Sequence, residues 1–236
     1  METQVSLEVV ALTKTLGLAA SPQASAVLRG VNMTIAPGEC LGLKGATGSG
    51  KTTLIRIIAG LMTPDSGEVH LGGQMISSSK TILPPAQRGV GLVFQSLGLW
   101  PHLNVNAHLD FVLSARKLTA ADKKTRRAEA LETFLLRDLA DRYPAELSGG
   151  ERHLLALARV FCSDMRLLLL DEPFNGLDSG LKGRILETLA RERTRRKLTT
   201  LLVTHNDDEM RLLCKRVEHL SEGRIIEHAR RMSNAE

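Results

Sequence analysis

The spacing of apolar residues changes twice along the chain and divides the sequence into three stretches. The first stretch contains short apolar runs of strand character, separated by the turn-rich segments "APGE" and "TPDSGE". These runs are "SLEVVAL", "VNMTI", "ECLGLKG" and "GEVHLGG". From about residue 97 to residue 158 the spacing becomes helical. Thr119 and Asp122 form a capping-box-like helix start there. Leu131, Leu135 and Leu139 then continue an i, i+4 stripe.

The last third returns to alternating strands and helices. Its two strand candidates, "RLLLLD" and "TTLLVTH", are apolar throughout, and they flank a predicted helix over "LKGRILETLARER". Strands without polar alternation are typical of parallel sheets that are covered on both faces. We therefore predict one α/β domain interrupted by a helical insertion.

Composition narrows the function classes. The 236 residues are 43% hydrophobic and 24% charged, which is typical of a globular protein. No apolar run reaches the roughly 18 residues of a membrane helix, and "METQVSLEVV" lacks a secretion signal, so we expect a cytoplasmic protein. Cys40, Cys162 and Cys214 are interpreted as small buried apolar residues.

The net charge of +5 does not by itself indicate a nucleic-acid partner. The basic runs "KKTRR" and "RERTRRK" lie in predicted helices with interspersed acids, which favours solvated helix faces. Aromatic residues make up only 3% of the chain, too few for a base-stacking platform. No nucleic-acid partner is expected.

The segment "GATGSGKTT" has the G-x-x-x-x-G-K-[ST] spacing of a phosphate-binding loop. It follows the strand candidate at 40–43 and opens a predicted helix, which is the context the motif requires. The residues on one face of that helix are Leu54, Ile57, Ile58 and Leu61. Glycines let backbone N–H groups converge on phosphate oxygens, Lys51 adds a positive charge, and the Thr52 hydroxyl suits Mg²⁺. A nucleoside triphosphate is predicted to bind here. The loop consists of Gly45, Ala46, Thr47, Gly48, Ser49, Gly50, Lys51, Thr52 and Thr53.

Four polar residues at predicted strand ends are further candidates. Asp171 and Glu172 close the strand "RLLLLD", and neighbouring strand residues point in different directions, so the two acids can take different roles. An aspartate in this setting holds Mg²⁺ in P-loop enzymes, and the glutamate is then available to polarise water. Gln95 and His205 end two other apolar runs.

A second small-residue segment, "LSGGERHLLALAR", precedes another helix. The residues on one face of this helix are Leu154, Leu157, Ala158 and Phe161. Helix N-termini attract anions, yet the chain already contains a better phosphate loop.

The motifs "GATGSGKTT", "VFQ", "LSGGE", "LLLLDEP", "GLD" and "VTH", in this order, resemble the nucleotide-binding subunit of an ABC (ATP-binding cassette) transporter. The resemblance runs from roughly residue 5 to residue 228. It implies a P-loop NTPase (RecA-like) α/β core with an antiparallel β subdomain and an inserted α-helical subdomain. Residues 1–236 would form a single domain, with 1–96 and 160–236 as the core and 97–159 as the helical part.

The resemblance also implies an ATPase built as a head-to-tail dimer, with a second copy or a paralogue as partner. The signature residues Leu147, Ser148, Gly149, Gly150 and Glu151 would contact the partner's ATP. Thr52, Gln95 and Asp171 would organise Mg²⁺. Glu172 would be the general base, His205 would contact the γ-phosphate, and Asp178 would reach across the dimer interface.

The segment "PPAQRGVGLVFQSLGLWPHLNV" is similar to importer cassettes. By that similarity, residues 95–103 would receive a membrane permease subunit, with Trp100 as an anchor or as a partly buried surface residue. An extracytoplasmic solute-binding protein would be a further partner, and the chain would lie on the inner face of the cell membrane. An exporter or lipid-handling ATPase, and a soluble ABC ATPase acting on DNA or ribosomes, are the alternatives.

Two positions depart from the family pattern. Leu16 stands where the family usually stacks an aromatic residue on adenine, and the missing ring is expected to cost on the order of 1–3 kcal/mol of binding. We therefore predict weak ATP affinity and poor discrimination between adenine and guanine. Glu151 replaces the commoner Gln, and Leu154 stands where Arg is frequent, yet activity is expected to be retained.

Overall fold

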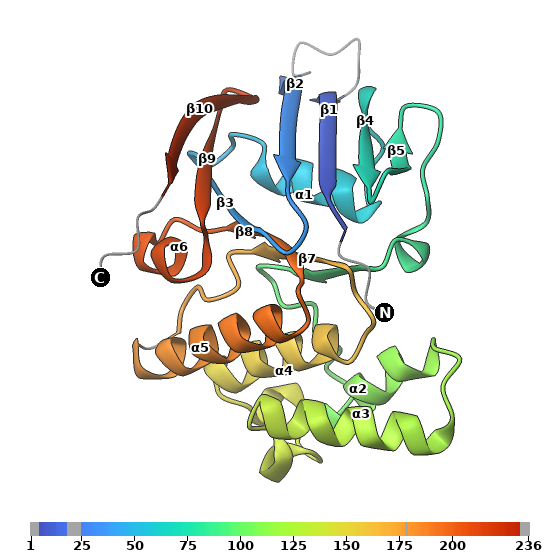
Figure 1. Cartoon of the computed structure of the whole chain (residues 1–236). Helices are drawn as coiled ribbons and strands as arrows, with labels where there is room; N and C mark the ends of the chain where they lie inside the picture. The colour runs from blue at the N-terminus through green and yellow to red at the C-terminus, as the bar shows by residue number, and fades with distance from the viewer. Residues whose placement is uncertain (1–4, 18–24, 178, 232–236) are drawn as a thin grey trace. The chain divides into compact units, whose positions relative to one another are not determined.

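A computed structural model describes residues 5–17, 25–177 and 179–231, and the side chains of 227–231 lie outside that description. The chain separates into two compact units. The sheet unit comprises Met1–Leu92, Arg166–Asp171 and Arg193–Glu236, and the helical unit comprises Val93–Met165 and Glu172–Glu192. Figure 1 labels the helices and strands of both units.

An antiparallel sheet forms the first part of the sheet unit. Its order is β2-β1-β4-β5, with β1 at Leu7–Leu16, β2 at Ser25–Ile35, β4 at Ser66–Leu71 and β5 at Gln74–Ser78. Leu7 lies opposite Ile35 on one side and Leu71 on the other. Leu7 and Val9 are buried whereas Glu8 is exposed, so one face of β1 enters the core.

A six-stranded sheet forms the second part, in the order β10-β9-β3-β8-β7-β6. Its strands are β3 (Cys40–Lys44), β6 (Val90–Val93), β7 (Leu167–Asp171), β8 (Thr199–Val203), β9 (Arg216–Ser221) and β10 (Arg224–Arg231). β7, β8, β3 and β9 are parallel, and β10 is antiparallel to β9. Every residue of β7 and β8 is buried, which confirms the interpretation of their continuous apolar runs.

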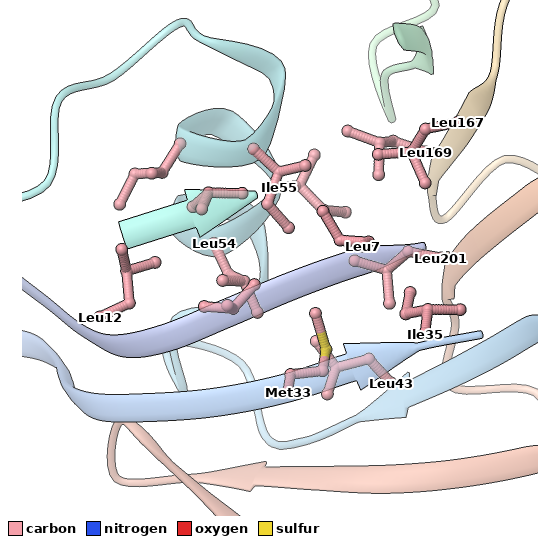
Figure 2. Close-up of a cluster of buried hydrophobic side chains, with 14 of the residues drawn as sticks. Leu7, Leu12, Met33, Ile35, Leu43, Leu54, Ile55, Leu167, Leu169 and Leu201 are labelled. Carbon is pink, nitrogen blue, oxygen red and sulfur yellow. The ribbon is translucent and has the colours of Figure 1, made fainter. Parts of the chain in front are cut away.

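The core of this unit lies where both sheets meet α1 (Lys51–Ala59). Figure 2 shows Leu7 and Met33 from the antiparallel sheet, Leu54 from α1, and Leu43 and Leu201 from the parallel sheet in one cluster. Leu54, Ile57 and Ile58 are fully buried as predicted, but Leu61 is 50% exposed, so placing it on the same face was wrong. The helix stops at Ala59 because Gly60 adopts φ 83° and caps its C-terminus.

α6 (Asp207–Leu213) also packs within this unit, against β3. A Cβ on Gly42 of β3 would lie 2.2 Å from Sδ of Met210, so only glycine permits this close approach. Nearby, the thiols of Cys40 and Cys214 lie 3.6 Å apart. All three cysteines are free and buried, as predicted, but their spacing in the sequence gave no sign of this contact.

The helical unit contains α2 (Val105–Ser114), α3 (Ala120–Thr133), α4 (Gly149–Phe161) and most of α5 (Ser179–Arg195), with short 3₁₀ turns at Arg137–Leu139 and Pro144–Glu146. Another 3₁₀ turn, Pro85–Gln87, lies in the sheet unit. The predicted apolar face of α4 is confirmed, since its four residues are all buried.

The N-terminus of α3 is confirmed, but its predicted apolar stripe is wrong. Thr119 caps the helix by accepting the backbone N–H of Asp122 at 3.1 Å. The helix ends at Thr133, and Leu135 lies beyond it with φ 56° and 53% exposure. A turn breaks the stripe there, because the left-handed backbone rotates Leu135 away from the core.

Basic residues of the run "KKTRR" pair with acids on the surface of this unit. Arg126 contacts Asp164 and Arg127 contacts Asp110, each at 2.6 Å between guanidinium nitrogen and carboxylate oxygen. The pairing agrees with the predicted solvated helix face. In the described parts of the chain, no helix is long and apolar enough to cross a membrane.

Candidate functional site

The loop at 45–53 has a backbone that only glycine can follow at two positions. Gly45 has φ 157° and Gly50 has φ 109°. A Cβ on Gly45 would lie 2.2 Å from the carbonyl oxygen of Leu220, and one on Gly50 would lie 2.8 Å from that of Val27. The Lys51 ammonium donates to the carbonyl oxygens of Gly45 at 2.6 Å and Ala46 at 2.9 Å. The loop therefore curls around its own lysine.

A cavity of about 380 Å³ opens at this loop. Its lining residues are Leu16, Val27, Gly48, Gly50, Lys51, Thr52 and Thr53. No side chain caps the N-terminus of α1, and its first turn carries no acid, so the positive end of the helix dipole faces the cavity. Ser49 Oγ is buried and, within the described residues, makes no hydrogen bond. The arrangement suits a multiply charged anion.

The other end of the cavity is aliphatic. Leu16 from β1 and Val27 from β2 line it, and none of the described residues that line it is aromatic. The sequence indicated Leu16 but not Val27. Val27 lies in β2, which pairs with β1, and its carbonyl oxygen would lie 2.8 Å from a Cβ on Gly50, so folding brings it to the loop. A flat ring placed here would contact branched alkyl groups and would not stack on another ring.

Three predicted features of the site, the loop, His205 and Asp171, stand at the carboxyl ends of neighbouring parallel strands. The loop follows β3, Thr204 and His205 follow β8, and Asp171 ends β7, with Leu43 and Asp171 both opposite Val203. The structure therefore brings the loop, His205 and Asp171 to one edge of the sheet. The Thr52 hydroxyl donates to Oδ2 of Asp171 at 3.1 Å, and Asp171 is 6% exposed. This pair was predicted from the sequence to share a metal ion.

Gln95 and Glu172 belong to the helical unit. Gln95 is exposed in the turn after β6. Glu172 is half-buried with φ 48°, and the Asn175 amide donates to its Oε2 at 2.9 Å. This left-handed backbone turns the chain sharply between Asp171 and Pro173. Asp178, the predicted interface residue, lies outside the described residues.

The signature residues 147–151 form the start of α4. Ser148 is the N-cap, its hydroxyl accepts the Glu151 N–H at 3.2 Å, and Glu151 Oε2 accepts the Ser148 N–H at 2.7 Å. This capping box gives the unusual Glu151 a structural role. A Cβ on Gly150 would lie 1.9 Å from Cδ2 of Leu181, whereas Gly149 has room around it. Leu147 is buried beneath the turn.

A cluster around Trp100 joins the 95–103 segment to α4. The Trp100 ring contacts Phe111 and stacks on His108, with 5.6 Å between the centroids of Trp100 and His108. Arg159 from α4 lies over the indole at 5.1 Å and donates to the carbonyl oxygens of Gly98 at 2.6 Å and Leu97 at 2.9 Å.

Burial lowers the pKa of both basic residues in this cluster, His108 and Arg159. His108 Nε2 accepts the backbone N–H of Trp100 at 2.9 Å, as a neutral imidazole does. Sequence reasoning found Trp100 but missed Arg159. A cation placed inside an otherwise apolar helix face was the available signal for it.

The geometry of the loop, the buried strand-end carboxylate and the glycine-rich helix start agrees with a match to a family of known proteins. The sequence profile described as "ABC transporter" matches residues 28–175, more than half of the chain. The chain belongs to the ABC transporter family. The matched span contains the loop at 45–53, Gln95, the signature, Asp171 and Glu172, and it ends before His205.

Relatives of this ABC family member include import proteins. It is 41% identical over 202 residues to the sulfate/thiosulfate import ATP-binding protein CysA of Brucella melitensis, covering 84% of this chain and 55% of that protein. It is 38% identical over 198 residues to the Fe(3+) ions import ATP-binding protein FbpC of Pseudomonas fluorescens, again covering 84% and 55%. The chain spans about half the length of these curated relatives.

Solved structures confirm the fold class. The ATP-binding cassette MJ0796, described as a dimer in a post-hydrolysis state bound to ADP and Pi, superposes with a TM-score of 0.86. That match covers 97% of this ABC chain and all of the other, at 26% identity. A second dimeric structure of that cassette gives a TM-score of 0.85. The predicted P-loop NTPase α/β fold is therefore confirmed, with its antiparallel and parallel sheets and separate helical unit.

Proposed function

We propose that this chain is the ATP-binding and ATP-hydrolysing subunit of an ABC importer, which drives solute transport through a separate membrane subunit. The observation that carries the proposal is the cavity at the start of α1, which combines a phosphate-type loop, Lys51 and the Thr52–Asp171 pair. The family and the import proteins among its relatives support it. Residues 1–236 would act as one ATPase domain, with residues 97–159 as its helical part.

The cavity fits a nucleoside triphosphate, and its polar end fits a divalent cation. Backbone N–H groups of the loop and Lys51 would hold the phosphates, with the base at Leu16 and Val27. The Thr52 hydroxyl and the Asp171 carboxylate, joined at 3.1 Å, are the hard oxygen ligands that Mg²⁺ prefers, and Gln95 would complete the set. When bound, Mg²⁺ would neutralise charge that develops on the phosphate oxygens.

Hydrolysis would proceed by attack of water on the γ-phosphorus. Glu172 would take a proton from that water while the bond from the γ-phosphorus to the β–γ bridging oxygen breaks, which releases phosphate and ADP. His205 would hydrogen-bond the γ-phosphate and orient it. Because phosphoryl transfer depends mainly on positioning and electrostatics, these few groups would be sufficient for hydrolysis.

The site would be completed by a second ATPase subunit, either a copy of this chain or a paralogue. In a head-to-tail dimer, the signature at 147–151 would meet the γ-phosphate held by the partner's loop, and Asp178 would reach across the interface. The dimeric cassette structures support this arrangement. Closing the dimer on ATP and opening it after hydrolysis would supply the mechanical step.

The 95–103 segment would bind the permease, with Trp100 as the anchor of that contact. Its cluster with Phe111, which is 56% exposed, supports an apolar docking site. The chain would then lie on the cytoplasmic face of the cell membrane. An extracytoplasmic solute-binding protein would deliver the solute to the permease.

The catalytic part of the proposal is tested by phosphate release from ATP by the purified chain, with and without Mg²⁺. Wild-type protein should hydrolyse ATP only with the cation, and Lys51→Ala should lose activity. Lys124→Ala, which removes an exposed lysine on α3, is the matched control and should keep full activity. Cation-independent hydrolysis, or unchanged activity in Lys51→Ala, would contradict the proposed site.

The import part is tested by a gentle-detergent pull-down of the tagged chain from its own membranes. Recovery of a multi-span permease together with a solute-binding protein would support import. Recovery of a membrane subunit with no binding protein would favour an exporter. Recovery of ribosomes or DNA would contradict the transport role but not the proposed ATP hydrolysis.

A further inference from the structure

The turn that carries His205 is closed by side chains that the proposed reaction does not use. The Thr204 hydroxyl donates to Oε2 of Glu209 at 2.5 Å and accepts the Asn206 N–H at 3.1 Å. Thr204 and Glu209 are 4% and 3% exposed, whereas His205 between them is exposed. The hydroxyl therefore spans the peptide bonds on both sides of His205.

The same turn is tied to the start of α6. The Asn206 side-chain oxygen accepts the N–H groups of Asp208 at 2.9 Å and Glu209 at 3.2 Å, as an N-cap does. One helical turn carries Glu209 back under Thr204, so helix start and turn form one closed ring of hydrogen bonds. Bending the turn at His205 would break several of these bonds together.

α6 is in turn fixed to the strand that leads into the phosphate loop. Gly42 of β3 lets Met210 approach closely, and Lys44, the last residue of β3, pairs with Asp207. Gly45 follows Lys44 directly, so the loop and the His205 turn are held to the same short length of β3. Both lie within the sheet unit.

We propose that Thr204 and Glu209 are positioning residues for His205. They hold its imidazole in the orientation that hydrogen-bonds the γ-phosphate bound by the loop. The inference rests on the proposed ATPase function. Only a hydroxyl can both donate to Glu209 and accept from Asn206, so serine can replace Thr204 but valine of the same shape cannot. A shift of about 1 Å at a reacting group can cost on the order of a hundredfold in rate.

The experiment compares Thr204→Val with Thr204→Ser in steady-state ATP hydrolysis. The valine variant should lower kcat by about tenfold or more, because His205 loses its orientation. The Kd for ATP, measured by calorimetry, should stay within about twofold, because loop and helix dipole are untouched. The serine variant should retain at least about half of the wild-type kcat.

Thr200→Val is the matched control. Thr200 lies in β8, the strand that leads into Thr204, and is fully buried. Among the described residues, its hydroxyl bonds only locally, to the Leu198 carbonyl oxygen at 3.3 Å. This control should keep kcat. Hydrogen exchange of the peptide covering 204–213 should accelerate in Thr204→Val and stay unchanged in Thr200→Val, which reports the turn without using activity.

Glu209→Gln and Glu209→Leu repeat the comparison from the other end of the hydrogen bond, and they decide the matter if Thr204→Val does not fold. The glutamine keeps an acceptor oxygen and should keep most of kcat, whereas the leucine should lose it. Equal kcat in the valine and serine variants, loss of ATP affinity in step with kcat, or an equal loss in Thr200→Val would overturn the inference. Absence of hydrolysis by the wild-type chain would instead overturn the proposed function.

Discussion

The two glycine-rich helix N-termini of this chain, those of α1 and α4, differ in whether a side chain accepts hydrogen bonds from their backbone N–H groups. α1 begins at a left-handed Gly50, with no side-chain cap and no acid in its first turn, and a cavity lies before it. α4 begins at Ser148, whose capping box with Glu151 satisfies two backbone donors, the N–H groups of Ser148 and Glu151, and places a carboxylate at the helix end. Similar sequences, "GSGKTT" and "LSGGER", thus produce one open and one closed helix end.

The difference explains why one chain contains two such segments. In the proposed function, the open end of α1 would offer its dipole and N–H groups to the phosphates of the ATP that the same chain binds. The closed end of α4 is held by its own capping box, and its accessible feature is the exposed Gly149, where an added Cβ would meet only Nη2 of Arg152, at 4.0 Å. In the proposed dimer, α4 would therefore cap a phosphate that the partner already holds. The open end of α1 should therefore govern the affinity for ATP, and the closed end of α4 should govern formation of the dimer.

The largest effect is expected at the open end. Lys51→Ala removes the ammonium that bridges the carbonyl oxygens of Gly45 and Ala46 and would contact the phosphates. ATP affinity should fall by about a hundredfold or more, because charged hydrogen bonds of about 1.5–3 kcal/mol each are lost. Equilibrium binding of a fluorescent ATP analogue measures this. If Lys51→Ala bound the ATP analogue with wild-type affinity, the start of α1 would not be the ATP-binding site.

Glu172→Gln is expected to separate binding from catalysis. The amide cannot accept the proton of the attacking water, so kcat should fall by about a hundredfold to ten-thousandfold while ATP affinity is retained. Single-turnover hydrolysis measures the rate, and Glu129→Gln, at an exposed position of α3, serves as the matched control. A Glu172→Gln variant that hydrolyses ATP at the wild-type rate would exclude this residue as the base.

Because the cavity is aliphatic at Leu16 and Val27, we expect the site at α1 to bind ATP weakly and to discriminate poorly between adenine and guanine. Leu16→Phe supplies a ring for stacking, and we expect ATP affinity to rise about tenfold to a hundredfold. Val10→Phe adds the same ring to β1 away from the lining of the cavity and should change nothing. Sub-micromolar binding of ATP by the wild type, with strong rejection of GTP, would refute the prediction.

The smallest effect is expected at the closed end in the absence of nucleotide. Ser148→Ala breaks the capping box, which should cost about 1 kcal/mol of the free energy of unfolding. That corresponds to a fall of about 2–4 °C in Tm for a chain of this size. Glu151→Gln keeps an acceptor oxygen and should leave Tm unchanged. Equal Tm values for all three proteins would show that the box does not stabilise α4.

Much of the site could be predicted from local sequence. The loop, the strand-end Asp171 and the N-cap at Thr119 depend on short motifs whose geometry is fixed within a few residues. The apolar runs of β7 and β8 likewise required burial on both faces.

The predictions that were wrong, and the contacts that were not predicted, depend on turns and on contacts between segments far apart in the sequence. Leu61 and Leu135 kept the helical spacing but lie beyond helix ends that backbone turns impose at Gly60 and in the segment after α3. Val27, Arg159 and the ring joining Thr204 to Glu209 gain their roles from segments that meet only after folding. Periodicity alone does not report such contacts.

Sedimentation of Glu172→Gln with Mg²⁺ and saturating ATP tests the central claim most directly, because this variant should bind ATP without consuming it. The account predicts a dimer that reverts to monomer when ATP is removed, and a monomer under all conditions when Lys51→Ala is added. A Glu172→Gln chain that stays monomeric while ATP is shown to be bound would contradict the idea that the closed end of α4 completes a partner's site.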